Sequence, residues 1–511
     1  MTARRVAIAS ALAMLATMAP SVSTPATAAP EPKTTDGCIS SVPEPGTSEA
    51  VKICYTLFKP AGASRAHKVP MVLHSHGWGG SRTTDVDSFE KWLNAGFGIL
   101  SFDQRGFGES GGKAHVENPA YEGKDVQRLV RLVSKLRWVK KDGKNDPRLG
   151  AIGGSYGGGY QFVGAFRQLM DRGEPIFDAL APEITWYDLK ESLAPQEVGR
   201  SAWITALTAA GAEALPPEVV AASLQGVATG MWPDGTVPGT ADMNAFFKKN
   251  GPAWHVAQGR RLDIPVLFGQ GATDTLFPLD QGLKNFQRAL TPKARRHSIF
   301  VGYNGGHVLP AVFPQAVGVA GDPCSKKLAG GSFTDLAIRF FTEKLKRKDT
   351  GLNGYGRYHL ATAGAGCTTV GSVVADKSFP VGTVATSETV GAPIAVKIAD
   401  GPIRVAGTPY LDGTMFAAGV NNRAFYGLAV GTSPADARLV QNNVLPVNEL
   451  APVLGEERSI ELPSVAVDVA KGESLFVLAT PISDTFAGMG SRTPGAIILQ
   501  DAVVRLPVVG R

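Results

Sequence analysis

The chain has 511 residues, of which 44% are hydrophobic, and it carries a formal net charge of +6. It is long enough to bury a large core and longer than one core usually organises, so we expect two or three domains. The positive charge is only weak evidence for a nucleic-acid partner, because the basic clusters at residues 140–141 and 344–348 have no interleaved aromatic residues. Nucleic acid is therefore excluded as an expected partner.

The first residues are typical of an export signal. Arg4 and Arg5 precede an apolar run from about residue 6 to 19, and small residues follow at 26–28. We expect cleavage after Ala28, which removes two arginines and no acid, so the net charge of +6 falls by 2 to +4. An uncleaved anchor is the alternative, but the run is shorter than the roughly 20 residues that span a bilayer. We therefore expect a secreted protein without a stable membrane span.

Four cysteines in an exported chain can form two disulfides, in three possible connectivities. Pairing neighbours in sequence joins Cys38 to Cys54 and Cys324 to Cys367. Neither pair has the short spacing of a zinc or redox site, so we expect structural disulfides.

Between residue 69 and about residue 348, apolar strand-like runs alternate with amphipathic helical patterns. This alternation is typical of an α/β protein with a mostly parallel sheet. The expected strands are 69–74, 97–102, 149–153, 264–270 and 298–303. Apolar spacing of three and four predicts helices around 89–93, at 126–136 and at 160–170, and a last helix that begins at Ser332 with Asp335 in its first turn.

Residues 182–261 interrupt this alternation with alanine-rich helical stretches and loops. We interpret the segment as a helical cap inserted between two strands of the sheet. It would lie over the carboxyl ends of the strands, where open α/β sheets bind ligands. Trp186 and Tyr187 are therefore candidate substrate-binding residues, and packing of the cap against the sheet is the alternative role for both.

After about residue 354 the chain turns to short β-type runs separated by glycine, proline and asparagine. Val465, Val467 and Val469 alternate with Ala466 and Asp468, as in a half-buried strand. We expect a β-sandwich or jelly roll. The predicted organisation is a signal peptide at 1–28, a catalytic domain at 29–181 and 262–353, a cap at 182–261 and a C-terminal β domain at 354–511.

The segment Gly153-Gly154-Ser155-Tyr156-Gly157 lies between an expected strand and an expected helix. Small residues around a serine at such a junction permit the strained turn of a nucleophile elbow. The alternative, a glycine-rich phosphate loop, lacks the Walker lysine. We therefore predict Ser155 as a nucleophile.

A neutral serine needs a histidine to accept its proton and an acid to orient that histidine. In this arrangement the acid and the histidine come later in the chain, in that order. Asp274 follows the expected strand 264–270, and His307 follows the expected strand 298–303. Asp280 and His297 are rivals, but the first is expected to begin a helix and the second lies at the wrong end of its strand.

An oxyanion hole needs two donors, ordinarily the amide after the nucleophile and one from a loop after an earlier strand. Tyr156 supplies the first, and we predict the Trp78 amide, in His76-Gly77-Trp78-Gly79-Gly80, as the second. His74 and His76 could form a metal pair, but no third ligand is nearby in sequence, so we predict no metal site.

The loop after the second expected strand, Asp103-Gln104-Arg105-Gly106, carries charges and glycines. We expect a structural role for it, in which Asp103 and Arg105 pair and fix the loop beneath the elbow.

The elbow, the loops at Asp274 and His307 and the β-rich tail together resemble the Xaa-Pro dipeptidyl-peptidase-like branch of the α/β hydrolases. That branch includes cocaine esterase and α-amino-acid ester hydrolases. In the tail, residues 407–411 and 475–479 resemble strands of its C-terminal jelly roll, and the resemblance covers about residues 50–511. It implies an α/β-hydrolase fold with a helical cap, a jelly-roll-like domain, and acyl transfer through a covalent acyl-serine without a cofactor.

The expected function is hydrolysis of a small-molecule ester or peptide. Several members of the branch place a tyrosine hydroxyl in the oxyanion hole from the early loop, where this chain has Trp78. A carboxylesterase is therefore an alternative to a dipeptidyl peptidase, and a non-catalytic binding protein is an alternative of another class. A peptidase that recognises a free amino terminus needs a buried carboxylate, for which Glu183 and Asp188 are candidates.

Overall fold

The computed structural model describes residues 31–309, 313–314, 316, 319–387 and 391–510. The expected signal peptide lies outside the described residues. No helix among those described has both the length and the apolar character needed to cross a membrane.

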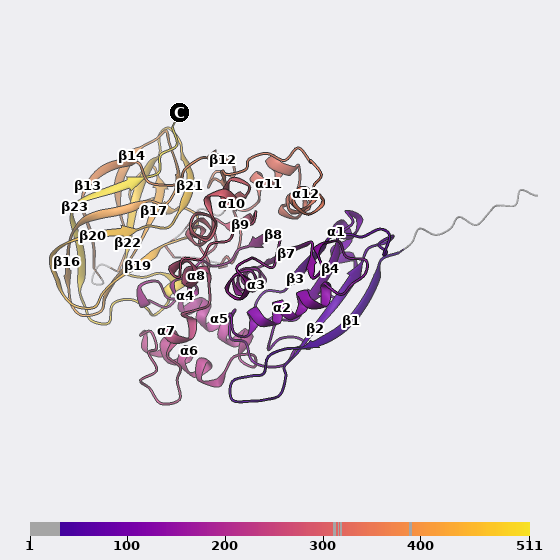
Figure 1. The fold of residues 1–511 in the computed structure, drawn as a ribbon. Coiled ribbons are helices and arrows are strands. Elements are labelled where there is room, and N and C mark those ends of the chain that lie inside the picture. Colours follow the sequence, from indigo (N-terminus) through magenta and orange to yellow (C-terminus); the bar gives the residue numbers. More distant parts are fainter. Residues whose placement is uncertain (1–30, 310–312, 315, 317–318, 388–390, 511) are drawn as a thin grey trace, which may run out of the picture. The chain divides into compact units, whose positions relative to one another are not determined.

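A ten-stranded sheet in the order β1-β2-β4-β3-β7-β8-β9-β10-β11-β12 carries the candidate site (Figure 1). The strands from β4 to β11 are parallel, and β1, β2 and β12 join antiparallel. The bounds are β1 Lys33–Ser40, β2 Lys52–Lys59, β3 Met71–Ser75, β4 Gly98–Phe102, β7 Leu149–Gly154, β8 Ala179–Glu183, β9 Leu267–Gly271, β10 Ile299–Tyr303, β11 Tyr358–Ala361 and β12 Cys367–Val370. The mostly parallel α/β sheet is thus confirmed.

The sheet also has strands that were not expected, namely β1, β2, β8, β11 and β12. Because β11 pairs in parallel with β10, the sheet continues past residue 353, where the C-terminal domain was expected to begin. The expected boundary at residue 354 is therefore too early in the chain. The strand β11, which lies next to β10 in the sheet, begins after that boundary.

Helices cover both faces of the sheet because its strands are apolar on both sides. Along β3 and β9, successive residues alternate between two core clusters, Leu73 and Phe268 in one and Val72 and Leu267 in the other. The first cluster packs beneath α2 (Glu122–Val133) and α3 (Tyr156–Arg172), and the second beneath α1 (Glu90–Asn94) and α12 (Phe333–Lys346). The strand ends are thereby held between two rigid layers.

Several of these helices match the sequence patterns closely. The capping box at Ser332 and Asp335 opens α12 as predicted. The remaining elements near the sheet are η1 Asp87–Phe89, β5 Lys141–Gly143, β6 Asp146–Pro147, α9 Leu279–Lys284, η3 Asn285–Ala289, α10 Pro292–Arg296 and α11 Pro323–Ala329.

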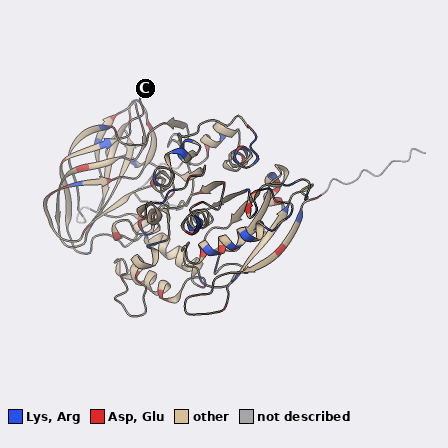
Figure 2. Cartoon of the chain, in the orientation of Figure 1, with Lys and Arg blue, Asp and Glu red and all other residues tan. Residues whose placement is uncertain are grey.

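The segment between β8 and β9 contains helices, as expected of the cap, although residues 182–183 of the expected cap range belong to β8. Its elements are α4 Leu189–Leu193, η2 Pro195–Glu197, α5 Ser201–Gly211, α6 Pro217–Thr229, α7 Met243–Phe247 and α8 Pro252–Ala257. Figure 2 shows α5 and α6 almost entirely without charged residues, and Glu218 is the single charged residue within their bounds.

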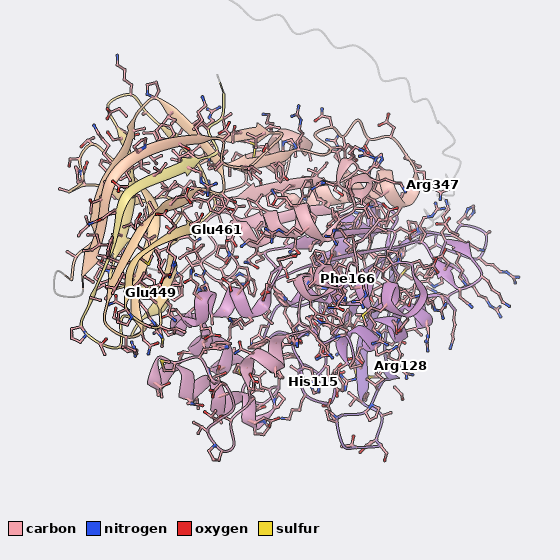
Figure 3. The ribbon with its side chains drawn as sticks, turned by 60° about the vertical axis from the view of Figure 1, so that its left-hand side comes forward. His115, Arg128, Phe166, Arg347, Glu449 and Glu461 are labelled. Carbon is pink, nitrogen blue, oxygen red and sulfur yellow. A yellow bond between two sulfur atoms is a disulfide. The ribbon has the colours of Figure 1, made fainter. Side chains whose placement is uncertain are left out.

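The C-terminal strands form antiparallel sheets around one apolar core, as expected of a β domain. A four-stranded sheet has the order β13-β23-β16-β20, and a second sheet has the order β14-β22-β17-β18, with β19 also paired to β17. The bounds are β13 Lys377–Ser387, β14 Ile394–Asp400, β15 Ile403–Gly407, β16 Tyr410–Ala418, β17 Asn422–Gly431, β18 Arg438–Leu439, β19 Leu445–Glu449, β20 Val453–Glu461, β21 Val465–Val469, β22 Ser474–Thr480, η4 Asp484–Phe486 and β23 Ala496–Leu506. Glu461, labelled in Figure 3, pairs with Lys284 of α9 at 2.7 Å and links the two parts.

Both expected disulfides are present. Cys38 and Cys54 lie directly opposite each other on β1 and β2, with their Cα atoms 4.0 Å apart. Cys324 of α11 is bonded to Cys367 of β12, with Cα atoms 5.2 Å apart. The second bridge fixes the last strand of the large sheet to a helix that covers it.

Candidate active site

Ser155 occupies a strained turn between β7 and α3. Its φ of 57° lies in a region that residues other than glycine rarely adopt. A Cβ on Gly157 would lie 2.3 Å from the Ser75 carbonyl oxygen, so only glycine allows the turn to approach β3 this closely. The Ser155 amide donates to the Glu183 carbonyl at 2.9 Å, which anchors the turn to β8. The backbone around Ser155 therefore adopts the conformation predicted for a nucleophile elbow.

The structure brings together the three residues predicted as nucleophile, base and acid. His307 Nε2 lies 2.9 Å from Ser155 Oγ, and His307 Nδ1 lies 2.7 Å from Asp274 Oδ2. The Asp274 side chain is completely buried. Its second oxygen, Oδ1, accepts hydrogen bonds from the Leu276 and Phe277 amides at 2.9 and 2.7 Å. These bonds fix the carboxylate with one oxygen toward the histidine.

Thr275 joins the acid loop to the histidine loop. Its amide donates to the His307 carbonyl at 2.9 Å, and its hydroxyl donates to the same oxygen at 3.0 Å. Two cap residues hold Thr275 in turn, because the Arg200 guanidinium donates to its carbonyl at 2.8 Å and Trp203 Nε1 donates to its hydroxyl at 3.0 Å. The sequence patterns did not indicate this role for any of the three residues, although Trp203 is one of the cap aromatics for which substrate binding is a candidate role.

The C-terminal β domain also reaches the acid loop. Asn443 Nδ2 donates to the Asp274 carbonyl at 2.8 Å, and Gln441 Nε2 donates at 3.0 Å to the Asn304 side chain in the loop before His307. Both donors are almost fully buried. They lie between β18 and β19, some 170 residues after Asp274 in the chain, and no sequence signal marks them.

The two residues predicted to form the oxyanion hole lie beside Ser155. Tyr156 is the first residue of α3, where a backbone amide has no acceptor within the helix. A Cβ on Gly77 would lie 3.8 Å from Ser155 Cβ, so the segment that includes Trp78 passes along the nucleophile. The Trp78 ring packs edge-on against Tyr156 at 5.0 Å, and its Nε1 donates to the Leu207 carbonyl of the cap.

The rival acid and the rival histidine lie elsewhere. Asp280 lies in α9, where its carboxylate accepts from Lys284 at 3.2 Å and from Gln281 at 3.0 Å. His297 ends α10 just before β10, at the end of that strand opposite to His307.

Glu183 and Asp188, the candidates for binding an ammonium group, do not line the cavity at Ser155 described below. Glu183 is half-buried, and its carboxylate accepts from the Tyr303 hydroxyl at 3.3 Å. Burial raises the pKa of Glu183 to about 7. Asp188 caps α4 by accepting from the Glu191 amide at 3.1 Å.

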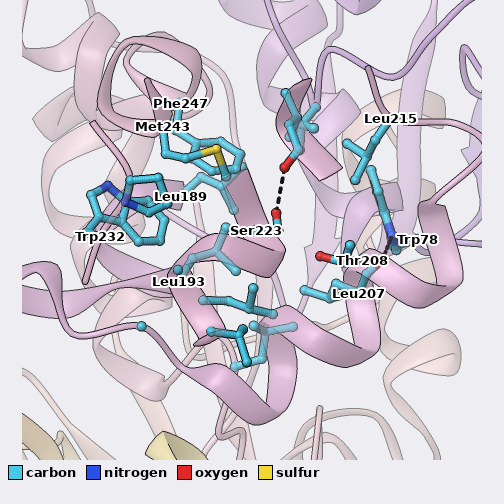
Figure 4. A pocket seen from close by; sticks show the side chains of 18 of the residues that line it. Trp78, Leu189, Leu193, Leu207, Thr208, Leu215, Ser223, Trp232, Met243 and Phe247 are labelled. Atoms are coloured by element: carbon cyan, nitrogen blue, oxygen red, sulfur yellow. Dashed lines mark hydrogen bonds between the residues drawn. The ribbon is translucent and has the colours of Figure 1, made fainter. Parts of the chain in front are cut away.

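Of the two aromatic candidates, Trp186 borders the cavity and Tyr187 does not. The cavity measures about 900 Å³ including its mouth and extends from Ser155 beneath the cap helices (Figure 4). Trp186 Nε1 donates to the Asn250 carbonyl at 2.6 Å, which fixes the indole as a wall. Tyr187 instead lies under the Arg288 guanidinium, 6.0 Å from its ring centre.

The expected pair between Asp103 and Arg105 is wrong. Asp103 is fully buried and binds Arg82 instead. Arg105 forms two hydrogen bonds to Asp125, at 2.8 and 2.9 Å, and one to Glu44 at 2.8 Å. Asp103 and Arg105 therefore have different partners, and each buried charge is paired with an opposite charge from another part of the chain.

His74 and His76, the two histidines that could form a metal pair, are engaged in hydrogen bonds within the protein. His76 Nε2 accepts from the Gln104 amide at 3.0 Å, and its Nδ1 lies 2.8 Å from the Gly77 carbonyl. His74 Nδ1 lies 3.0 Å from the Ser101 hydroxyl.

Two curated relatives, both described as an uncharacterized 31.7 kDa protein in the traX-finO intergenic region of Escherichia coli, are 35% identical to this chain over 100 and 97 residues. The matched stretch is 19% of this chain and 33% or 32% of each relative. The chain thus spans about a third of the length of these relatives.

Solved structures similar to this one support the fold. An aminopeptidase from a marine sediment Thaumarchaeota archaeon has a TM-score of 0.64 at 14% identity, over 96% of this chain and 98% of that one. A CocE/NonD family hydrolase from Staphylococcus aureus has a TM-score of 0.61 at 12% identity, over 93% and 97%. An α-amino acid ester hydrolase has a TM-score of 0.59 at 13% identity, over 96% and 100%. The α/β-hydrolase fold with an all-β C-terminal domain is confirmed.

The family model described as X-Pro dipeptidyl-peptidase (S15 family) matches residues 49–308, which is about half of the chain. The match contains Ser155, Asp274 and His307 and ends one residue after the last of them. The expected resemblance is confirmed: the chain belongs to the X-Pro dipeptidyl-peptidase (S15) family.

Proposed function

We propose that this protein is a serine hydrolase that cleaves an ester or peptide bond of a small-molecule substrate through an acyl-serine intermediate. The observation that carries the proposal is the continuous chain of hydrogen bonds from Ser155 Oγ through His307 to the buried Asp274 carboxylate, at 2.9 and 2.7 Å. Ser155 is the nucleophile, His307 the general base and Asp274 the group that orients the imidazole.

In the first half-reaction, Ser155 Oγ attacks the substrate carbonyl carbon while its proton passes to His307 Nε2. The bond to the leaving alcohol or amine then breaks, and His307 returns the proton to that group. Water repeats the sequence on the acyl-serine, which releases the acid and restores the serine hydroxyl. The Tyr156 and Trp78 amides are the proposed donors to the oxyanion, and the amino end of α3 adds positive potential there.

We also propose that the protein is secreted. The two disulfides support this, because such bonds persist mainly in oxidising surroundings. The expected cleavage after Ala28 is tested by sequencing the amino terminus of protein recovered from the medium of producing cells. An uncleaved, cell-bound chain contradicts it.

A fluorophosphonate probe tests the nucleophile directly, because it phosphonylates only an activated serine. We expect labelling of Ser155 in the mature protein, none in Ser155→Ala, and a loss of at least about 10⁴-fold in kcat for that variant. Ser88→Ala removes an exposed hydroxyl and serves as the matched control, with labelling unchanged. Failure of the folded protein to be labelled contradicts the proposal.

A further inference from the structure

The cavity at Ser155 is built from one apolar face of each of several cap helices. On α5, Ile204, Leu207 and Thr208 recur at a spacing of three and four, and on α6 Val219, Ser223 and Val227 recur at a spacing of four. Both spacings place side chains on a single face of a helix. The two faces, with α7 and Trp186, line a cavity of about 900 Å³, a figure that includes its open mouth.

Four polar groups of the lining residues are used within the protein, whereas the buried Tyr156 hydroxyl has no hydrogen-bond partner among the described residues. Trp186 Nε1 donates to the Asn250 carbonyl, Trp78 Nε1 to the Leu207 carbonyl, and Trp232 Nε1 to the Asn244 side chain. The Ser223 hydroxyl donates to the Val219 carbonyl one turn earlier at 2.9 Å, as the dashed line in Figure 4 shows. These groups therefore offer a ligand carbon surface rather than free hydrogen-bonding sites.

Among the described residues that line the cavity, none carries a carboxylate, an ammonium, a guanidinium or an imidazole group. The buried acid Glu117 follows the lining residue Val116 in sequence, but it borders a separate space of about 250 Å³ that shares Trp186 with the cavity. Burial raises the pKa of Glu117 well above its usual range, which disfavours the charged carboxylate there. A substrate ammonium in the cavity would lose its hydration and find no counter-charge, so its binding there is unfavourable.

The cavity adjoins the acyl side of the scissile bond. The residues that border it include Ser155 and both proposed oxyanion residues, Tyr156 and Trp78, whereas His307 is not among them. The leaving group must depart next to His307, which returns the proton to it. The part of the substrate that stays bonded to Ser155 is therefore the part that faces the cavity.

We infer that the cavity holds an uncharged, apolar acyl group, and that the preferred substrates are esters of medium-length aliphatic acids rather than peptides with a free amino terminus. This inference rests on the proposed function and specifies its substrate class. The reaction is hydrolysis: water adds across the acyl–oxygen bond and yields the carboxylic acid and the alcohol.

The test compares p-nitrophenyl acetate, butyrate and octanoate with the α-amino derivative of the octanoate. Each rate is divided by the spontaneous hydrolysis rate of the same ester. We expect kcat/KM to rise about fourfold for each added methylene until the cavity is filled. The α-ammonium should lower kcat/KM at least tenfold relative to the plain octanoate. Flat rates along the series, or a preference for the α-amino ester, would overturn the inference.

A substitution that fills the cavity provides the structural link. Val227→Trp on α6 should lower the octanoate-to-acetate ratio of kcat/KM at least tenfold. Leu224→Trp, on the exposed side of the same helix, should leave that ratio unchanged. Leu207→Trp repeats the test from α5 if the first variant does not fold, and equal ratios in all variants contradict the inference.

Labelling of Ser155 separates the two possible failures. A protein that reacts with the fluorophosphonate but prefers free-amino substrates disproves the acyl-chain inference and leaves the hydrolase proposal intact. A folded protein that neither reacts with the probe nor hydrolyses any ester disproves both.

Discussion

Two regions meet at Ser155, and they are built in different ways. Around Asp274 and His307, side chains and loop carbonyls have identified hydrogen-bond partners, drawn from the sheet, the cap and the β domain. The cavity beneath the cap is formed instead by apolar faces of helices. In the proposed enzyme, the hydrogen bonds of the first region would position the reacting groups, whereas the shape of the cavity and its lack of charge would select the substrate. Substitutions in the first region should change the rate, and those in the second should change which ester reacts.

Asp274→Asn should have the largest effect and tests the directional region. The amide can still accept from the Leu276 and Phe277 amides, but it cannot stabilise the imidazolium that forms on His307. We expect kcat to fall about 10⁴-fold with every ester in the series. Asp280→Asn, at the rival buried acid, is the control and should leave kcat within about twofold. A larger loss for Asp280→Asn than for Asp274→Asn would show that the acid has been misassigned.

A substitution at Glu183 tests whether its side chain belongs to the catalytic region. The Glu183 carbonyl accepts from the Ser155 amide, whereas its carboxylate contacts Tyr303 and does not line the cavity. Burial raises the pKa of Glu183 from 4.5 to about 7, so the folded chain holds this proton more tightly than the unfolded chain. Its contribution to the free energy of unfolding is complete below about pH 4.5 and is lost as the pH rises to about 7. The loss amounts to about 3 kcal/mol.

Glu183→Gln should remove this pH dependence, as measured by urea unfolding at pH 5 and pH 8. The exposed Glu49→Gln should retain it. Because we place the Glu183 carboxylate outside the reacting groups, kcat should change by less than about threefold. A large loss of kcat without a change in the free energy of unfolding would show that Glu183 takes part in catalysis.

Asn443→Ala should have the smallest effect and tests whether the β domain belongs to the directional region. Without the amide, the Asp274 carbonyl loses its donor and the acid loop is less firmly placed. We expect kcat to fall about tenfold while KM changes little, since misplacement of catalytic groups acts mainly on the rate. Asn448→Ala removes a comparable bond, from the β domain to the Gln196 carbonyl in the cap. Equal losses of kcat in the two variants, in line with their stabilities, would reduce Asn443 to a general structural role.

The elbow and the order of the predicted acid and histidine could be read from the sequence because their signals are local. Glycines on both sides of Ser155 and the strand and helix around it lie within about 25 residues. β8 was missed for the opposite reason: its sequence, Ala179–Glu183, contains two alanines and a proline, which have low strand propensity. Its place in the sheet comes from burial between β7 and β9 rather than from its own preference.

Contacts between distant segments account for what the sequence did not reveal. Asp103 and Arg105 are two residues apart, yet their partners, Arg82 and Asp125, are about 20 residues away in opposite directions. Asn443 lies in a turn with Asn442, and the tail has a second such asparagine pair at residues 421–422. Only folding of the whole chain brings such residues to the acid loop.

The bonds from Gln441 and Asn443 have a consequence for the order of synthesis. The ribosome completes Ser155, Asp274 and His307 long before it adds the turn that holds the acid and histidine loops. The emerging chain can therefore contain all three reacting residues without their final alignment. We expect full esterase activity to appear only once the C-terminal β domain has folded. The cell that synthesises the protein is then exposed to little hydrolytic activity from incomplete chains.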